Sequence, residues 1–312
     1  MKIAIVGAGI CGLYLSRKLA EKGHEVTVFE KKERVGKETC SGLFSERILE
    51  FIPESKNLIQ NQIDFVLIHF PKKTLKIKFS RKFLVMSHYE LDNLAADLAE
   101  KAGANIILSH NISESDSDIF QINDRVIGCD GANSIIRKYL GLAAPDFWLA
   151  IQGFIPEKNS ADLVETWPQK RGFIWKIPRG SETEYGIISN PKGAKLLFDG
   201  FLEKNNLQLK KLGSALVSQG LIIPKNPGIT LCGDSAGLTK PWSGGGVIWG
   251  LIAANLLLKN FPDFLKYQKE VKKFFLPKII LSKTAKKIVY FLGFNFPWLL
   301  PKNVKIESDF LI

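Results

Sequence analysis

The chain has 312 residues, of which 46% are hydrophobic and 24% are charged. This composition is typical of a folded globular protein and excludes a disordered or fibrous chain. The length fits one large domain or two of ordinary size, since a domain usually has roughly 100 to 200 residues. The 43 Lys and Arg outnumber the 31 Asp and Glu, for a formal charge of +12. This charge favours acidic partners such as nucleic acid, anionic lipid or phosphorylated small molecules.

The four cysteines are scattered singly along the chain, at Cys11, Cys40, Cys129 and Cys232. Since no two of them form a CxxC motif, we expect reduced thiols in a cytosolic protein and no metal site. The chain begins with an apolar run, residues 1–6, which turns at once into a glycine loop. This start predicts a buried strand and no signal peptide.

The hydrophobic pattern predicts alternating strands and helices in the first half of the chain. We expect strands at 2–6, 25–30, 63–70, 75–79, 104–108 and 125–129, and helices at 12–22 and 89–102. Residues 147–190 are rich in aromatics and alternate between apolar and polar positions, which predicts an inserted antiparallel sheet. A helix at 196–207, a buried strand at 228–232 and an apolar helix at 246–259 are expected to follow.

The first strand leads into GAGICG, residues 7–12, in the context that a dinucleotide-binding turn requires. Gly7 permits the tight turn, Gly9 lets backbone N–H groups approach a pyrophosphate, and Gly12 allows close packing of the helix on the strand. Glu30 ends the second strand, where its carboxylate can accept hydrogen bonds from both ribose hydroxyls and would repel a 2′-phosphate. The motif therefore predicts FAD or NAD and excludes NADP.

Two later segments favour FAD over NAD. Residues 128–137 run from a strand through Asp130 and a glycine into a helix. The structural alternative is that Asp130 only caps this helix while Arg137 lies in solvent. Residues 230–247 place Asp234 at a strand end, where it can accept from a ribityl hydroxyl, and then bring glycines and a helix N-terminus to the isoalloxazine. The cofactor residues predicted in this segment are Gly233, Asp234, Gly244, Gly245, Gly246 and Val247.

The expected fold is α/β, with a Rossmann-like FAD-binding domain, an inserted antiparallel-sheet substrate domain and a helical C-terminal tail. The predicted FAD-binding segments are 1–62, 89–146 and 226–260. The substrate domain comprises a hairpin at 63–88 and an antiparallel sheet at 147–225, and the tail covers 261–312.

Motifs in these segments resemble those of a known family. The quoted stretches are VGKETCSGL at 35–43, FIWKIPRG at 173–180, CGD at 232–234 and PWSGGG at 241–246. The first resembles the cysteine-glycine stretch of geranylgeranyl reductases, and the second resembles their aromatic segment with proline and a basic residue. Together the motifs are similar to archaeal-type members of that family, such as the digeranylgeranylglycerophospholipid reductases, which are flavoproteins on the para-hydroxybenzoate hydroxylase plan. The resemblance covers most of residues 1–256.

The resemblance implies a reductase that saturates geranylgeranyl chains, with reduced flavin giving a hydride to one carbon of a prenyl double bond and an acid protonating the other. It implies that Cys40 is a catalytic and cofactor-binding residue, whereas a lone cysteine is more often a small buried apolar side chain. Phe173, Trp175 and Trp242 are candidates to line an apolar tunnel for the substrate, although such aromatics are more often plain core. The implied partners are a prenylated lipid and an external electron donor such as NAD(P)H or ferredoxin.

The tail alternates lysines with apolar and aromatic clusters, for example at 272–276 and 286–292. Basic amphipathic segments bind anionic membrane surfaces. Residues 288–300 are very apolar, but they are fewer than the roughly 20 that span a bilayer. We therefore expect a cytoplasmic protein held peripherally at the cytoplasmic membrane face, with a solvated helix packed on the flavin domain as the alternative. Since no nucleic-acid module accompanies the charge, we expect no nucleic-acid partner.

Two other functions remain open on the sequence. The same scaffold supports an FAD-dependent monooxygenase or halogenase that acts on an aromatic or apolar small molecule. The chain is alternatively a flavin- or lipid-binding protein without turnover. Ser41 and His88, which depart from the family pattern, support this last function.

Overall fold

The computed structural model describes residues 1–37, 39–113, 116, 118–307 and 309. This described part of the chain divides into two compact units. The first unit consists of segments within 1–37, 89–146 and 218–277, and the second of segments within 38–88, 147–217 and 278–312. Each unit is therefore assembled from stretches that lie far apart in the sequence.

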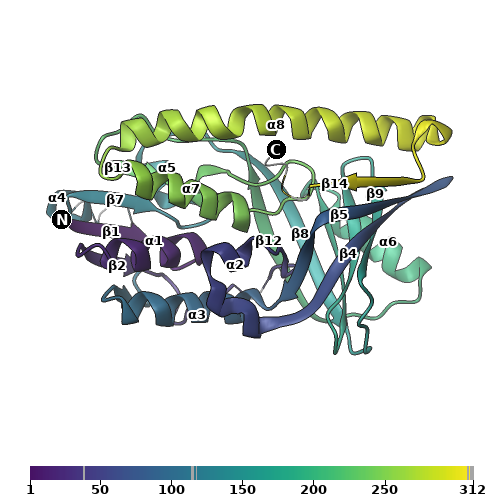
Figure 1. The fold of residues 1–312 in the computed structure, drawn as a ribbon, viewed down its shortest axis with the longest axis horizontal. Helices are drawn as coiled ribbons and strands as arrows, with labels where there is room; N and C mark the ends of the chain where they lie inside the picture. Colours follow the sequence, from purple (N-terminus) through teal and green to yellow (C-terminus); the bar gives the residue numbers. More distant parts are fainter. Residues whose placement is uncertain (38, 114–115, 117, 308, 310–312) are drawn as a thin grey trace. The chain divides into compact units, whose positions relative to one another are not determined.

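The first unit is built on a parallel sheet (Figure 1). Its strands are β1 (Lys2–Val6), β2 (Glu25–Phe29), β6 (Asn105–Ile107), β7 (Arg125–Gly128) and β13 (Ile229–Leu231). They lie in the order β13-β7-β1-β2-β6, and every neighbouring pair is parallel. The central strand β1 is buried from Ile3 to Val6, because a parallel sheet has both faces covered.

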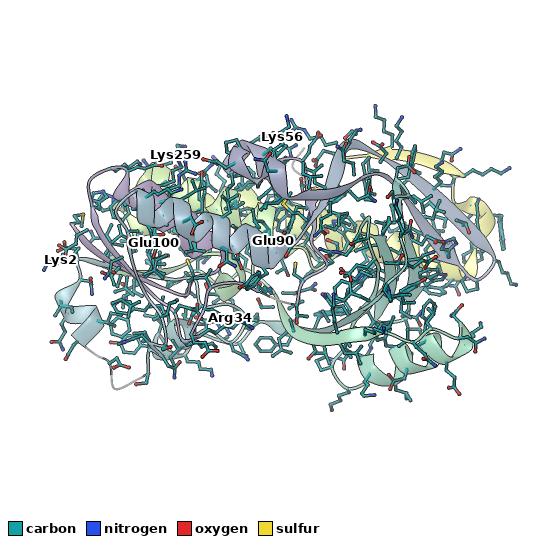
Figure 2. The ribbon with its side chains drawn as sticks, turned by 90° about the horizontal axis from the view of Figure 1, so that it is seen from below. Lys2, Arg34, Lys56, Glu90, Glu100 and Lys259 are labelled. Atoms are coloured by element: carbon teal, nitrogen blue, oxygen red, sulfur yellow. The ribbon has the colours of Figure 1, made fainter. Side chains whose placement is uncertain are left out.

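Helices surround this sheet. α1 (Ile10–Ala20) contacts β1, β2 and α7 (Val247–Asn260). α7 also packs on the first half of α8 (Phe264–Asn295), where the rings of Trp249 and Phe275 lie 5.2 Å apart. α3 (His88–Lys101) buries Leu91, Ala95 and Ala99 and leaves Glu90 and Glu100 exposed (Figure 2). Three short helices complete the unit: α4 (Asp118–Ile122), α5 (Ile135–Tyr139) and the 3-10 turn η2 (Gly233–Ala236).

The second unit is built on a mixed sheet. Its strands are β3 (Leu43–Ser45), β4 (Ile59–Phe70), β5 (Lys73–Met86), β8 (Asp146–Ile155), β9 (Leu163–Gln169), β10 (Gly172–Pro178), β11 (Thr183–Ser189), β12 (Lys210–Gln219) and β14 (Asn303–Ile306). The order is β12-β8-β11-β10-β9-β4-β5-β14, with β3 on β5. The β4–β9 and β5–β14 pairs are parallel, and the β4–β5, β9–β10, β10–β11 and β8–β11 pairs are antiparallel.

Side chains alternate between the two faces of this sheet, as the pleat requires. On β10, Phe173 and Trp175 join one core cluster, while Ile174 joins another with Ile187 on β11. Phe198 of α6 (Ala194–Lys204) packs into the second cluster. The remaining short elements of the unit are α2 (Ile48–Phe51), η1 (Pro53–Leu58) and η3 (Pro297–Leu299).

The expected α/β fold is confirmed: the chain has a Rossmann-like sheet, an inserted sheet and a C-terminal helix. Two details differ from the prediction. The inserted sheet is mixed and not purely antiparallel, and the tail ends in strand β14, which pairs with β5. Both differences arise from pairings between distant segments, which local patterns do not encode. Within the ranges that the structure describes, no helix has the length and apolarity needed to cross a membrane.

Gly250 allows α7 to approach α1. A Cβ at this position would lie 2.5 Å from Sγ of Cys11. We expect G250A to lower the apparent free energy of unfolding by about 1 to 3 kcal/mol, because it overpacks the contact. C11A/G250A should recover most of this loss, since alanine at position 11 removes the clash. Urea unfolding followed by circular dichroism measures both effects.

The matched control for this test is G200A on α6, where an added Cβ would meet nothing within 4 Å. We expect G200A to raise the free energy of unfolding by about 0.5 to 1 kcal/mol, as alanine usually does in a helix. If G250A unfolds at the same urea concentration as the unchanged chain, the close approach of α1 and α7 is wrong.

Candidate functional site

The predicted cofactor residues follow the carboxyl ends of four strands of the first unit. Gly7 follows β1, Glu30 follows β2 and Asp130 lies just beyond β7. Gly233 and Asp234 lie just beyond β13. Because the sheet is parallel, all these strand ends lie at one edge, where α/β proteins bind their ligands. The structure therefore brings together predicted residues from both ends of the sequence.

Gly7, Gly9 and Gly12 form the turn between β1 and α1. Gly7 has a φ of +103°, and a Cβ there would lie 2.5 Å from the carbonyl oxygen of Cys129. A Cβ on Gly12 would lie 2.1 Å from the carbonyl oxygen of Gly7, so the helix begins in direct contact with the turn. Both positions therefore require glycine for steric reasons.

Gly9 differs from its neighbours because it faces open space. It is the N-cap of α1, and among the described residues nothing lies within 4 Å of where its Cβ would be. In this part of the chain no side chain caps α1, and its first turn contains no acidic residue. The first N–H groups of the helix and its positive dipole end are therefore available to an anion such as a pyrophosphate.

Glu30 accepts hydrogen bonds from the glycine turn and from the loop that follows β2. The N–H of Ala8 donates to Oε2 at 2.8 Å, and the N–H of Lys32 donates to Oε1 at 3.0 Å. A carboxylate oxygen accepts more than one hydrogen bond. Glu30 thus retains the capacity to accept from ribose hydroxyls, and that role stays a prediction.

Asp130 caps α5 with one of its oxygens. Oδ2 accepts from the N–H groups of Ile135 at 2.6 Å and Ile136 at 3.3 Å. Burial raises the pKa of this carboxyl group. The other oxygen, Oδ1, is buried and has no hydrogen-bond partner in the described part of the chain. Since buried polar atoms are nearly always paired, this oxygen indicates a place for a donor from a ligand or a water.

Arg137 does not lie in solvent, so that part of the structural alternative is wrong. The residue is 3% exposed. Its Nη1 donates to the carbonyl oxygen of Ser235 at 2.7 Å, and its Nη2 donates to that of Ala132 at 2.5 Å. Arg137 is buried because these carbonyl groups need a donor, and it joins the Asp130 segment to the Asp234 segment.

Asp234 lies at the N-terminus of α7. A Cβ on Gly246, the N-cap of this helix, would lie 2.5 Å from Oδ1 of Asp234, so glycine lets the carboxylate approach the helix end. Oδ2 lies 3.6 Å from Nζ of Lys37. Gly244 has a φ of +74°, which glycine adopts without strain. Gly245 and Val247 flank the same turn, which is thus built to present backbone groups.

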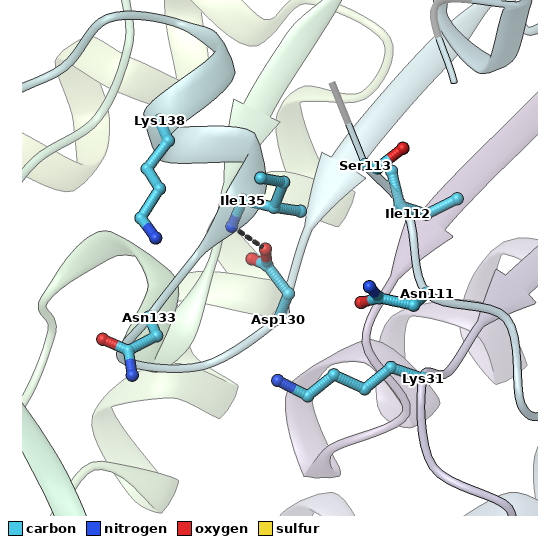
Figure 3. Close-up of a pocket in the computed structure, with 8 residues that line it drawn as sticks. All are labelled: Lys31, Asn111, Ile112, Ser113, Asp130, Asn133, Ile135 and Lys138. Atoms are coloured by element: carbon cyan, nitrogen blue, oxygen red, sulfur yellow. Dashed lines mark hydrogen bonds between the residues drawn. The ribbon is translucent and has the colours of Figure 1, made fainter. Parts of the chain in front are cut away.

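A cavity of about 650 Å³ opens at the same edge of the sheet (Figure 3). Its lining residues are Lys31, Asn111, Ile112, Ser113, Asp130, Asn133, Ile135 and Lys138. Asp130, Asn133 and Ile135 lie in the segment 128–137 that the sequence analysis singled out, whereas it missed the loop at 111–113, which carries no motif. Strand β6 pairs in parallel with β2, so the carboxyl end of β6 lies at the same edge as Glu30. This pairing would have identified the loop at 111–113 as part of the site.

The arrangement fits a bound FAD. The uncapped N-terminus of α1 suits a pyrophosphate, and the cavity is within the usual size range for small-molecule sites, roughly 300 to 1,000 Å³. Among the described residues, no side chain caps the N-terminus of α7 either, which leaves backbone donors for a second part of a long cofactor. NAD would not account for the glycine turn before α7, whereas the isoalloxazine of a bound FAD would.

The predicted substrate-side residues fall in both units. Cys40 is half-buried in the second unit, and its carbonyl oxygen accepts from Nε2 of Gln152 at 3.2 Å. Trp175 is 7% exposed within the core of the second sheet, with Phe173 half-buried beside it. Trp242 lies half-buried in the first unit, with the cofactor residues. Their contacts with flavin and substrate stay predictions. Residue 38, within the family stretch, lies outside the described residues.

The fold and the dinucleotide site define the class: the chain is an FAD-dependent oxidoreductase. A family model described as an NAD(P)-binding Rossmann-like domain matches residues 5–42. The chain is similar to the digeranylgeranylglycerophospholipid reductase of Thermoplasma acidophilum, with 25% identity over 98% of this chain and 91% of the relative. The expected resemblance to geranylgeranyl reductases is thereby confirmed, and the alignment extends beyond residue 256 into the tail.

Solved structures share the fold. A geranylgeranyl bacteriochlorophyll reductase-like protein from Thermoplasma acidophilum matches with a TM-score of 0.77 and 22% identity, over 92% of this chain and 86% of that one. A tryptophan 6-halogenase from Streptomyces toxytricini matches with a TM-score of 0.72 and 13% identity, over 94% of this chain and 78% of that one. At these identities the matches establish the fold and do not separate a reductase from a halogenase.

Valine at Gly9 tests the cofactor site. The backbone of Gly9 is extended, so the fold should tolerate G9V, whereas the new side chain would fill the space in front of α1. We expect FAD retained after gel filtration to fall at least about tenfold, because the phosphate loses its approach to the helix N-terminus. Flavin absorbance per chain is the measurement.

The matched control is G193V, since Gly193 is the N-cap of α6 and also faces open space. It should leave the flavin content unchanged. A G9V protein that keeps the flavin content of the unchanged chain would show that FAD does not bind at α1.

Proposed function

We propose that this protein is an FAD-dependent reductase that saturates double bonds of geranylgeranyl chains in isoprenoid lipids of the archaeal type. The observation that carries the proposal is the similarity to a digeranylgeranylglycerophospholipid reductase along nearly the whole chain. The site geometry supports it independently, since the residues at the sheet edge fit FAD. The electrons would come from an external donor such as NAD(P)H or ferredoxin.

The chemistry requires a hydride and a proton at the two carbons of one double bond. Bound FAD, once reduced by the external donor, would supply the hydride and return to its oxidised form. An isolated alkene is hardly polarised, so exact placement of the reacting groups and a nearby proton donor must lower the barrier. In this proposal Gly9, Glu30 and Asp234 hold the cofactor, while Cys40 serves at the reacting end.

Cys40 differs from the other cysteines in its exposure. Cys11, Cys129 and Cys232 are buried in the first unit, whereas Cys40 is half-buried in the second. A partly exposed cysteine is reached by a substrate more readily than a fully buried one. This contrast supports the proposal that Cys40 contacts the reacting groups.

An apolar chain needs an apolar path. Phe173 lies half-buried beside Trp175, with ring centroids 6.0 Å apart, on the same face of β10. Trp242 is half-buried next to the glycine turn of α7. We propose that these aromatic side chains contact the prenyl chain, since large aromatic surfaces bind apolar groups by excluding water.

The tail presents an exposed apolar surface on the second unit, which we call the tail patch. Its residues are Ile280, Leu281, Ile288, Phe291, Trp298 and Leu299, each between 53% and 70% exposed. On the other side of the helix, Tyr290 donates to the carbonyl oxygen of Gly172, and Nζ of Lys286 lies 4.9 Å from the ring centroid of Trp148. The inner face is thus packed on the sheet, and the tail patch is not part of a core.

Lysines accompany the tail patch. Lys283 and Lys287 lie on the exposed side of α8, and Lys302 follows η3. Exposed aromatic and aliphatic side chains with flanking lysines match an anionic bilayer surface. We propose that the protein takes its lipid substrate from the cytoplasmic membrane face through this patch.

Anaerobic reduction of the flavin tests the reaction. We expect the protein, reduced with dithionite, to be reoxidised by a digeranylgeranyl lipid without oxygen, with one lipid double bond reduced for each flavin reoxidised. Reoxidation only by oxygen with an aromatic compound would indicate a monooxygenase or halogenase. No reoxidation by either would indicate a flavin- or lipid-binding protein. Flavin absorbance and mass spectrometry of the lipid distinguish the three outcomes.

Vesicle sedimentation tests the membrane contact. We expect F291S/W298S to reduce partitioning onto vesicles with anionic phosphatidylglycerol at least about tenfold, because each side chain loses the gain from burial in lipid. The matched control is L196S, which removes an 80% exposed leucine from α6. Equal sedimentation of F291S/W298S and the unchanged chain would rule out the tail patch as the contact surface.

A further inference from the structure

Trp175, Arg179 and Glu184 of the second unit form a connected network of buried side chains. Trp175 and Ile177 share a face of β10, and Arg179 follows at the end of the strand. Glu184 on β11 lies directly opposite Ile177. Because diagonal neighbours across two strands are within reach of long side chains, Glu184 contacts both Trp175 and Arg179.

The ion pair in this network is buried. Arg179 is 7% exposed and Glu184 is 0% exposed. Nη1 of Arg179 donates to Oε2 of Glu184 at 2.6 Å, and Nε1 of Trp175 donates to Oε1 at 2.9 Å. Burial raises the pKa of the Glu184 carboxyl group, and the charge of Arg179 opposes that rise.

The guanidinium group of Arg179 reaches three further acceptors. Nη1 donates to the carbonyl oxygen of Ser41 at 2.8 Å. Nη2 donates to Oε1 of Gln60 and to the carbonyl oxygen of Met86, both at 3.1 Å. A planar fork of donors suits such a set of acceptors, and a lysine ammonium does not.

The network holds the turn that carries Cys40. Three successive carbonyl oxygens of this turn accept hydrogen bonds: that of Cys40 from Gln152, that of Ser41 from Arg179, and that of Gly42 from the N–H of Met86. Gly42 has a φ of +61°, and a Cβ there would lie 2.7 Å from Nη2 of Arg179. The turn therefore packs in direct contact with the guanidinium group.

We propose that Arg179, Glu184 and Gln152 are positioning residues that fix the Cys40–Gly42 turn for the reduction. The proposal rests on the proposed function in one respect, namely that Cys40 acts at the reacting end. Glu184 orients the guanidinium group, and Arg179 and Gln152 then hold two adjacent carbonyl oxygens. The thiol of Cys40 is thereby kept in one place by its own backbone.

Stability alone does not explain this ion pair. Removing two charges from water has a large cost, and well-packed apolar residues often stabilise a protein as much as a buried ion pair does. An apolar pair at 179 and 184 would leave the carbonyl oxygen of Ser41 without this donor. The pair therefore makes sense as a device that orients the turn.

R179M/E184Q tests the proposal with the enzyme loaded with FAD. The double change removes both charges, so it leaves no lone buried charge that would unfold the protein. We expect the rate of Cys40 alkylation by iodoacetamide to rise about tenfold, because the turn loses a charge-assisted hydrogen bond. We also expect kcat for lipid reduction to fall by a similar factor while KM for the lipid stays unchanged. R179K should give intermediate values.

The alkylation readout reports on Cys40 selectively. A hydrogen bond with Cys232 and burial raise the pKa values of Cys11 and Cys129, whereas hydrogen bonds with these two cysteines lower the pKa of Cys232. All three side chains are buried in the first unit, and burial makes them slow to react with iodoacetamide. C40A identifies the phase that belongs to Cys40, since that phase should disappear.

The matched control is K176M, on the same strand. Lys176 forms a mostly buried ion pair with Glu165 at 3.1 Å, in which the two side chains are 28% and 25% exposed. K176M should change neither the alkylation rate nor kcat.

The proposal is overturned if R179M/E184Q matches the unchanged chain in three measurements: the urea concentration of unfolding, the rate of Cys40 alkylation and kcat. If R179M/E184Q does not fold, Q152L decides, since it removes the donor to Cys40 without touching a charge. A folded Q152L with the alkylation rate of the unchanged chain overturns the proposal, and a faster rate supports it. The test also separates the two proposals: faster alkylation in the variants of a chain that reduces no lipid would support the held turn and refute the reductase.

Discussion

The parallel alignment of β13, β7, β1 and β2 is the constraint on which the site depends. It sends the turns after these strands to one edge, and glycine keeps the backbone there within reach of a ligand. Gly12 packs against Gly7, and Gly246 packs against Asp234, at distances that admit no side chain. The backbone geometry thus leaves the N-termini of α1 and α7 accessible to a ligand. In the proposed site, nucleotide binding would rest on N–H groups and helix dipoles more than on the high positive charge of the chain.

The second unit has a different organisation, because side chains on its sheet hold the turn that is proposed to take part in the chemistry. The core of one face contains Trp175, and the buried pair of Arg179 and Glu184 connects that core to the Cys40 turn. Arg179, the basic residue near the end of the segment at 173–180, is therefore connected to Trp175 through Glu184. This contact gives a physical reason for the four-residue spacing of Trp175 and Arg179, since both side chains must reach the carboxylate of Glu184 on the neighbouring strand. The same unit carries the tail patch, whose lysines account for part of the positive charge.

Local patterns predicted most of the first unit and much less of the second. Mostly apolar runs that end at glycine turns mark β1, β7 and β13, because parallel strands are buried on both faces. The burial of Arg137 escaped prediction, since its acceptor on Ser235 comes from a distant segment. The network of Arg179 escaped for the same reason: Ser41, Gln60 and Met86 meet it only after β10 and the β4–β5 hairpin are paired in one sheet. β14 lies in a tail that was expected to be helical, and no local sequence pattern predicts its pairing with β5.

The central claim is that the sheet edge of the first unit binds FAD. Release of the bound nucleotide from freshly purified protein by acid, followed by chromatography against standards, tests it most directly. The account predicts FAD in an amount close to one per chain, with the absorbance bands of oxidised flavin in the intact protein. A chain that releases NAD, or no dinucleotide even after incubation with FAD, would contradict the account.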